Sequence, residues 1–113
     1  MARRKESKRQ IVLALRAHAT LRQIWAWNAG QRGERHADSY ENFLFGRIER
    51  LSKLPELGEA LADFPDVRRL LVQRRGGGYG HLVFYRVQVE TIEVLVIYHT
   101  AQDWQSYIEE DIR

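Results

Sequence analysis

The chain has 113 residues, of which 44% are hydrophobic and 29% charged, with no cysteine and a net charge of +3. This length suits one domain and is too short for two. The lack of cysteine excludes a disulfide framework, a thiolate metal site and a thiol nucleophile, and fits a cytoplasmic protein. Arginine supplies fifteen of the eighteen basic residues. Because guanidinium forks match phosphates and carboxylates, we expect an anionic partner, with a solvated basic face as the alternative.

The first residues predict a basic, disordered tail over 1–8, followed by a single domain over 9–113. The apolar run at 11–15 is shorter than the core of a signal peptide and far shorter than a membrane span. We therefore expect neither secretion nor a membrane partner. The run is predicted to be the first strand instead.

Two amphipathic helices are predicted next, over 17–29 and 35–54. Gly30 and Gly33 are expected to break the first helix and make a tight connection, and Pro55 to end the second. The apolar side chains that recur at helical spacing are Ala17, Leu21, Ile24, Tyr40, Phe43, Leu44, Ile48 and Leu51. The two helices should form a hairpin.

The second half of the chain has the period of two that is typical of strands, with β-branched and aromatic residues. After the helices we expect a loop over 55–66 that could hold one helical turn at 59–63. A strand over 67–73, a glycine-rich hairpin tip over 74–80 and a strand over 81–87 follow. A polar link then leads to a strand over 92–99, and a short amphipathic helix over 101–112 ends the order. The order β-α-α-β-β-β, with a C-terminal helix, predicts an α+β fold in which the helical hairpin packs on a small antiparallel sheet.

Several short motifs occur together in this order. They are Leu-Arg-Gln-Ile-Trp at 21–25, Tyr40, Leu-Pro-Glu-Leu-Gly at 54–58, His-Leu-Val-Phe-Tyr-Arg-Val at 81–87, Thr-Ile-Glu-Val-Leu at 91–95, Tyr98-His99 and Asp103-Trp104. With these motifs the chain resembles the RelE/ParE superfamily of bacterial type II toxin–antitoxin toxins, and its ParE-like branch more closely. The resemblance covers about residues 9–104 and implies the same helical hairpin on a small antiparallel sheet.

For the ParE-like branch, the resemblance implies a toxin that binds DNA gyrase, stalls its cleaved complex with DNA and needs no chemistry from its own residues. It also implies a cognate antitoxin, which would lay an amphipathic segment across the toxin in a hetero-oligomer. We therefore predict no catalytic residue and no cofactor. No two histidines or carboxylates fall at metal-ligand spacing within one element, so we predict no metal site either.

The alternative is a RelE-like, ribosome-dependent and metal-independent mRNA endonuclease. The resemblance would then place His99, Tyr98 and Arg86 at the site. His99 would protonate the leaving 5′ oxygen and arginine would stabilise the charge on the phosphate. The run 96–98 lacks the basic residue that family members usually have two or three positions before this histidine, which favours the binding toxin.

Whether these three residues meet depends on strand pairing. His99 is expected on the strand face of Leu95 and Ile97, whereas Arg86 is expected on the face of Phe84. His81 is interpreted as a hairpin-end residue, and His99 could equally cap its strand by hydrogen bonds.

Basic and aromatic side chains outside the predicted core are the candidates for partner binding. They are Arg68, Arg69, Arg74, Arg75, Arg86, Trp27, Phe45 and Trp104. Each has a structural alternative: Arg86 could pair with Asp63 or Asp103, Trp27 and Phe45 could be partly buried at the helix seam, and Trp104 could pack the C-terminal helix on the sheet.

Overall fold

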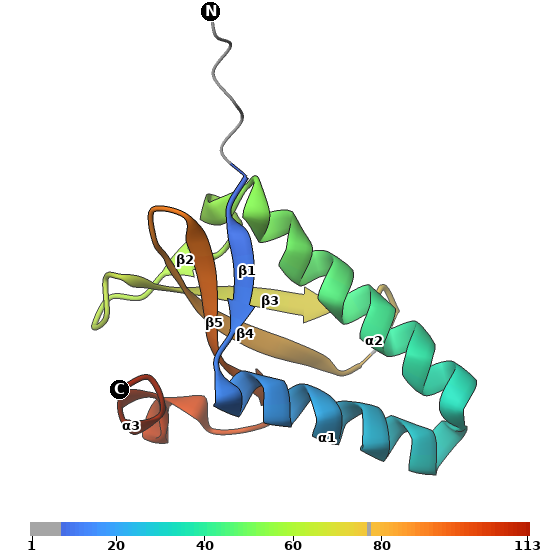
Figure 1. Ribbon diagram of the computed structural model, residues 1–113. Helices are drawn as coiled ribbons and strands as arrows, with labels where there is room; N and C mark the ends of the chain where they lie inside the picture. The colour runs from blue at the N-terminus through green and yellow to red at the C-terminus, as the bar shows by residue number, and fades with distance from the viewer. Residues whose placement is uncertain (1–7, 77) are drawn as a thin grey trace, which may run out of the picture.

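A computed structural model describes residues 8–76 and 78–113 (Figure 1). The predicted tail lies outside these ranges except for Lys8. The elements are β1 (Gln10–Leu13), α1 (Leu15–Arg32), α2 (Glu34–Glu49), β2 (Glu59–Ala60), β3 (Val67–Gln73), β4 (Gly80–Val87), β5 (Thr91–His99) and α3 (Ile108–Asp111), with 3₁₀ turns at Arg50–Ser52, Pro55–Leu57 and Trp104–Ser106. The predicted α+β fold is confirmed.

The strands form one sheet in the order β1-β5-β4-β3-β2. The predicted antiparallel pairing holds for β3, β4 and β5, but β1 runs parallel to β5, with Ile11 beside Ile92. The prediction of a loop or helical turn at 59–63 is wrong at its start, because Glu59 and Ala60 pair with β3 as a short edge strand. Two exposed residues carry too little periodicity to reveal a strand.

The helical hairpin covers one face of the sheet (Figure 1). Buried side chains from both helices, from the 3₁₀ turn after α2 and from β3, β4 and β5 make the core between these layers: Ala17, Leu21, Leu44, Ile48, Leu51, Val72, Val83, Tyr85, Ile92, Val94 and Ile97. The predicted apolar stripes of the two helices point into this core. We call this side of the sheet the helix face.

The first helix is longer than predicted, because α1 continues through Gly30 to Arg32. Only Gly33 breaks the chain between the helices, with a φ of 94° that residues with a Cβ rarely adopt. A glycine inside a helix weakens it by roughly 1 kcal/mol, which packing against the sheet can offset. The second helix also ends earlier than predicted, with its last turn tightened to 3₁₀ geometry at Arg50–Ser52.

The opposite face of the sheet is covered by the C-terminal segment. Its cluster contains Val67, Phe84, Leu95, Val96, Tyr98 and Ile108, with Leu61, Phe64, Leu82, Trp104 and Ile112 packed against it. The predicted helix over 101–112 forms only as the turn Trp104–Ser106 and the single turn α3. Among the described residues, no helix is long and apolar enough to cross a membrane.

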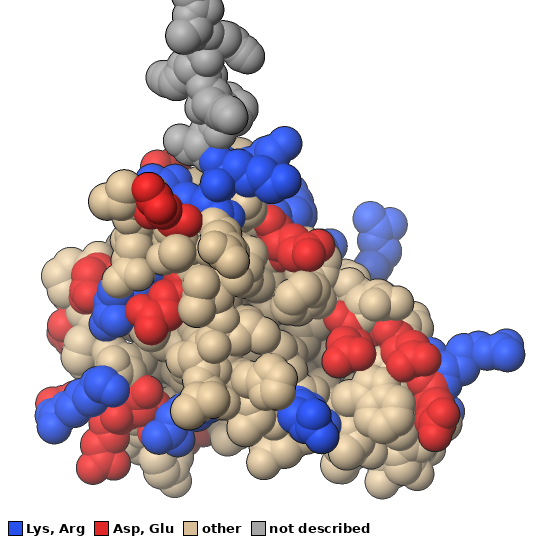
Figure 2. Space-filling model, in the orientation of Figure 1, with Lys and Arg blue, Asp and Glu red and all other residues tan. Residues whose placement is uncertain are grey.

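On the face of the molecule seen in Figure 2, basic and acidic side chains alternate around an uncharged central area. The net charge of +3 therefore does not form a single basic surface on this side. An anionic partner would therefore have to bind a smaller group of basic side chains.

A buried tyrosine fixes the chain that follows the second helix. The Tyr85 hydroxyl donates to the carbonyl of Pro55 at 2.6 Å and accepts from the Gly58 N–H at 2.9 Å. A Cβ on Gly58 would lie 2.7 Å from the same hydroxyl and 2.8 Å from the Arg69 carbonyl, so no larger residue fits. Arg68 donates to the Gly58 carbonyl from the other side. These contacts explain why the motif at 54–58 ends in glycine.

We predict that Tyr85→Phe lowers the free energy of unfolding by about 1–3 kcal/mol, because it leaves the Pro55 carbonyl and the Gly58 N–H without a partner. Urea unfolding followed by circular dichroism measures the change. Tyr107→Phe is the matched control, since Tyr107 is 55% exposed, and should change the free energy by less than about 0.5 kcal/mol. Equal effects of the two substitutions would contradict the anchoring role of Tyr85.

Candidate functional site

A groove of about 970 Å³ lies where the helical hairpin meets the ends of β4 and β5. It is lined by Thr20, Gln23, Ile24, Trp27, Asn28 and Arg32 of α1, His36 and Tyr40 of α2, Arg74, Arg75, Gly76, Gly78 and Tyr79 between β3 and β4, and His81, His99 and Gln102. Gly77 of the predicted hairpin tip is not among the described residues. A volume of this size suits a small ligand or one segment of a larger one.

Strand register brings two histidines to the floor of the groove. His81 pairs with His99, and their rings meet edge to face with centroids 5.4 Å apart. A register shift next to Phe84 leaves Leu95 without a partner residue, so the second half of β5 presents the opposite residues to the helix face. The alternation predicted that His99 shares a face with Leu95 and Ile97; this is right for Ile97 and wrong for Leu95. His99 lies on the helix face.

Both histidines have one ring nitrogen fixed by a hydrogen bond. The Nδ1 of His81 lies 2.7 Å from the Tyr40 hydroxyl, and the Nδ1 of His99 accepts from the Ala101 N–H at 3.0 Å. In the neutral form of His99 the proton is then on Nε2, which is left as a donor. His81 is buried, so its interpretation as a simple hairpin-end residue misses its contact with α2.

Aromatic rings continue from the two histidines in both directions. Centroids are 5.2 Å apart between His99 and Tyr79, 5.6 Å between His81 and Tyr40, and 5.9 Å between Tyr40 and Phe43. We call Phe43, Tyr40, His81, His99 and Tyr79 the ring row. It links α2, β4, β5 and the β3–β4 connection.

Burial keeps the inner part of the ring row uncharged. Burial, and to a smaller extent the nearby charge of His99, together lower the pKa of His81 to about 4. Burial also raises the pKa of Tyr40, which the nearby Arg74 guanidinium partly offsets. At neutral pH both groups are neutral, so the positive charge of the groove comes mainly from its arginines.

The two arginines of the β3–β4 connection differ in how they are held. Arg74 donates from one Nη2 to the backbone and side-chain oxygens of Ser39, both at 2.8 Å, and stacks over Tyr40 and Phe43 at 5.6 and 5.0 Å. It pins the connection to α2. Arg75 is exposed and makes no hydrogen bond or ion pair with any described residue.

The structure does not bring His99, Tyr98 and Arg86 together. Tyr98 points to the face opposite the helices, where its hydroxyl donates to Asp111. Burial is the larger cause that raises the pKa of Tyr98, and the contact with Asp111 raises it as well. Arg86 lies on that same face but toward the other end of the hairpin, opposite Glu93. Two of the three residues thus share a face without sharing a site.

Arg86 is paired, but with other carboxylates than the two predicted. Its Nε lies 2.8 Å from Asp66, and its Nη1 lies 3.5 Å from Glu93. The expected partners Asp63 and Asp103 are not used, because Glu93 sits directly across the β4–β5 ladder from Arg86.

The remaining predicted partner-binding residues are spread over several surfaces. Arg74, Arg75 and Trp27 belong to the groove, and Trp27 is 62% exposed. On the other face of the sheet, Arg69 pairs with Glu59 and lies 5.4 Å from the Trp104 ring, which packs 5.0 Å from Phe84. Arg68 is bonded to Gly58, and Phe45 is half-buried on α2.

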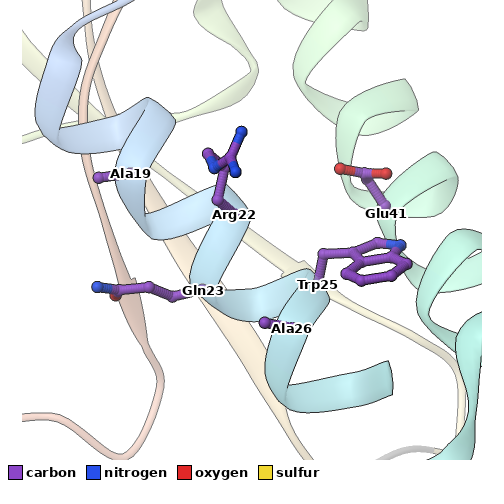
Figure 3. A pocket seen from close by; sticks show the side chains of 6 residues that line it. All are labelled: Ala19, Arg22, Gln23, Trp25, Ala26 and Glu41. Atoms are coloured by element: carbon purple, nitrogen blue, oxygen red, sulfur yellow. The ribbon is translucent and has the colours of Figure 1, made fainter. Parts of the chain in front are cut away.

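A second, shallower hollow of about 530 Å³ lies between the two helices (Figure 3). Trp25 extends from α1 toward α2 and donates from its ring to Asp38 at 2.9 Å. Arg22 and Glu41 line the same hollow, so it carries both signs of charge. No predicted site residue falls in it, and its contacts are those of a helix seam.

The sequence did not identify most of the groove lining, including Tyr79, Arg32 and His36. The sequence signal for Tyr79 is an aromatic residue within the glycine-rich tip, where little can cover it. Its side chain is 68% exposed in the structure, and exposed aromatic rings mark contact surfaces. Within residues 8–76 and 78–113, no group of three or more His, Cys, Asp or Glu side chains could hold a metal ion.

Comparison with known proteins gives consistent results. Residues 11–104 match a family model described as the ParE toxin of the type II toxin-antitoxin system parDE. Over 96 residues the chain is 29% identical to Toxin ParE1 of Caulobacter vibrioides, a match that covers 85% of this chain and 94% of that protein. A solved structure titled "Chromosomal ParDE TA system from P. aeruginosa" superposes with a TM-score of 0.66 at 19% identity, covering 81% of this chain and 96% of that one. At this identity the structural likeness bears on the fold.

We predict that His81→Gln reduces the loss of stability in mild acid. The pKa of His81 falls from its ordinary 6.5 to about 4 on folding, so the unfolded chain binds an extra proton between these values. The neutral His81 does not lower the free energy of unfolding above pH 6.5. As the pH falls from 6.5 toward 4, protonation of this histidine in the unfolded chain lowers that free energy by up to about 3 kcal/mol. Urea unfolding at pH 7.5 and 4.5 measures the difference.

His18→Gln is the matched control, since His18 is exposed on α1, and it should keep the wild-type dependence on pH. The titratable groups in contact with His81 are Tyr40 of α2 and His99 of β5, and neither is changed by either substitution. An unchanged pH dependence in His81→Gln would show that this imidazole is not held neutral by folding.

Proposed function

Since the chain belongs to the ParE toxin family of type II toxin–antitoxin systems, we propose that it binds and inhibits DNA gyrase and that a cognate antitoxin neutralises it. The observation that carries this proposal is the family match, which runs from β1 through both helices and the whole sheet to Trp104. The relative from Caulobacter vibrioides supports it, because the two proteins align over nearly their full lengths.

The separation of the candidate catalytic residues supports a binding function over ribosome-dependent mRNA cleavage. In the nuclease, His99, Tyr98 and Arg86 would all have to lie within reach of one phosphate, where the acid and the charge-stabilising group act together. His99 lies on the helix face, while the Tyr98 hydroxyl is bonded to Asp111 on the other face, and Arg86 is held by two carboxylates. Inhibition by binding needs no such convergence.

Exposed apolar side chains outside the groove support a protein partner. They are Val12, Leu15, Leu54, Leu57, Leu71 and Val89, with exposures between 40% and 88%. An amphipathic antitoxin segment buries apolar side chains of this kind. In our proposal the half-exposed arginines Arg68, Arg69 and Arg86 exchange their present contacts for acidic groups of the partner.

The test is a supercoiling assay with purified gyrase. We expect the chain to inhibit supercoiling and to accumulate cleaved DNA, and a cognate antitoxin to restore gyrase activity. Tyr98→Phe should inhibit as well as the wild type, because the lost hydroxyl only bonds Asp111; circular dichroism checks that the variant is folded.

The opposite pattern would support the nuclease. It consists of intact gyrase activity together with ribosome-dependent mRNA cleavage that disappears in Tyr98→Phe and in His99→Ala. Harmless expression in a sensitive bacterial host would contradict both toxin mechanisms.

A further inference from the structure

We propose that the groove between the helical hairpin and the ends of β4 and β5 binds a nucleotide unit, free or within a single-stranded nucleic acid. In this proposal bases stack on the exposed rings of Trp27 and Tyr79, and the phosphate is held by Arg75 and Arg32. The inference is independent of the gyrase target, since it concerns the groove alone.

The first argument is charge. The groove lining contains three arginines and three histidines and no aspartate or glutamate, although the chain has fifteen acidic residues. None of the five ion pairs formed between described residues includes a groove residue. Elsewhere the signs are mixed, as on the face seen in Figure 2. An acid-free groove whose arginines lack carboxylate partners in the described chain is suited to an anion.

The second argument is the kind of apolar surface. Trp27 and Tyr79 are 62% and 68% exposed in the same groove, which leaves two large flat rings in contact with water. Ile24 is the sole aliphatic side chain in the described lining. A helical peptide needs aliphatic sockets for its anchors, whereas a nucleobase needs a ring to stack on. The lining therefore fits a base better than an acidic protein segment.

The third argument is hydrogen bonding. The side-chain amides of Gln23, Asn28 and Gln102 line the groove, and His99 has its Nε2 free of the contact that fixes Nδ1. The Gln102 Oε1 already accepts from the His99 N–H at 2.7 Å, so Gln102 offers its NH2 group as a donor. Amides can both donate to and accept from the edges of a base that is not paired. Tyr40 and His81 are already bonded to each other, so they form the floor instead of reading the ligand.

The experiment measures binding of the whole chain to a fluorescein-labelled single-stranded DNA of twelve thymidines and to the matching RNA, by fluorescence anisotropy. We expect saturable binding that Trp27→Ala and Tyr79→Ala each weaken at least about fivefold, because a base stacked on an aromatic ring is lost. Arg75→Gln should weaken binding and reduce the slope of log K against log salt by about one, since one phosphate contact disappears.

Two substitutions outside the groove serve as matched controls. Tyr107→Ala removes a tyrosine of similar exposure in the C-terminal segment, and Arg22→Gln removes an α1 arginine that lines the other hollow. Both should bind like the wild type. A second readout is tryptophan fluorescence: the unlabelled strand should quench it in the wild type and lose most of that effect in Trp27→Ala, which keeps Trp25 and Trp104.

Competition then identifies the source of the nucleotide. Displacement by adenosine or thymidine monophosphate would show that a free nucleotide suffices, and displacement by oligonucleotides alone would assign a strand. The proposal is overturned if neither strand binds, if the groove and control substitutions have equal effects, or if poly-glutamate of similar length displaces the strand as well as an unlabelled oligonucleotide does. The last result would assign the groove to an acidic protein segment.

Discussion

Pairing between β4 and β5 is the constraint on which both layers of the molecule depend. The shift in this pairing next to Phe84 leaves Leu95 unpaired and sets which side chains of β5 pack in each of the two hydrophobic clusters. Val94 and Ile97 both face the helical hairpin, whereas Leu95 and Val96 both face the C-terminal segment. A regular strand alternates strictly between its two faces, and a bulge of one residue exchanges them. The same bulge sets which side chain of β5 meets His81.

The parts of the fold that could be predicted are those whose burial repeats at a fixed spacing. The helical stripe from Tyr40 to Leu51 and the strand over 67–73 occur where their patterns place them. Features without such a pattern were missed. They are β2, which is two exposed residues, and the last turn of α1, which passes through Gly30 because tertiary packing outweighs local preference. The parallel direction of β1 depends on the path of the helices and leaves no mark in its own four residues.

The candidate site was harder to predict, because it depends on register. Val87 pairs with Ile92, and extending this register without a bulge would put His81 opposite Tyr98. The β-branched residues of this strand give no sign of the bulge. His99 follows Tyr98 in the sequence, and without the bulge its place opposite His81 in the groove could not be predicted. The partner of Arg86 was missed for a related reason, since Glu93 becomes its neighbour through the hairpin ladder. Residue types indicated an anionic partner, and only pairing shows which side chains converge.

The contacts of Asp111 have a consequence for the order in which parts of the molecule open. Asp111 accepts from the Tyr98 hydroxyl and lies 3.4 Å from Arg16 at the start of α1, so it joins the last turn of the chain to one of its first. Ordering contacts between such distant residues is entropically expensive, and they form late in folding. The C-terminal segment packs on its own small cluster, separate from the core under the helices. It can therefore unfold locally while the helical hairpin and sheet stay intact, and that opening would uncover a second apolar face of the sheet.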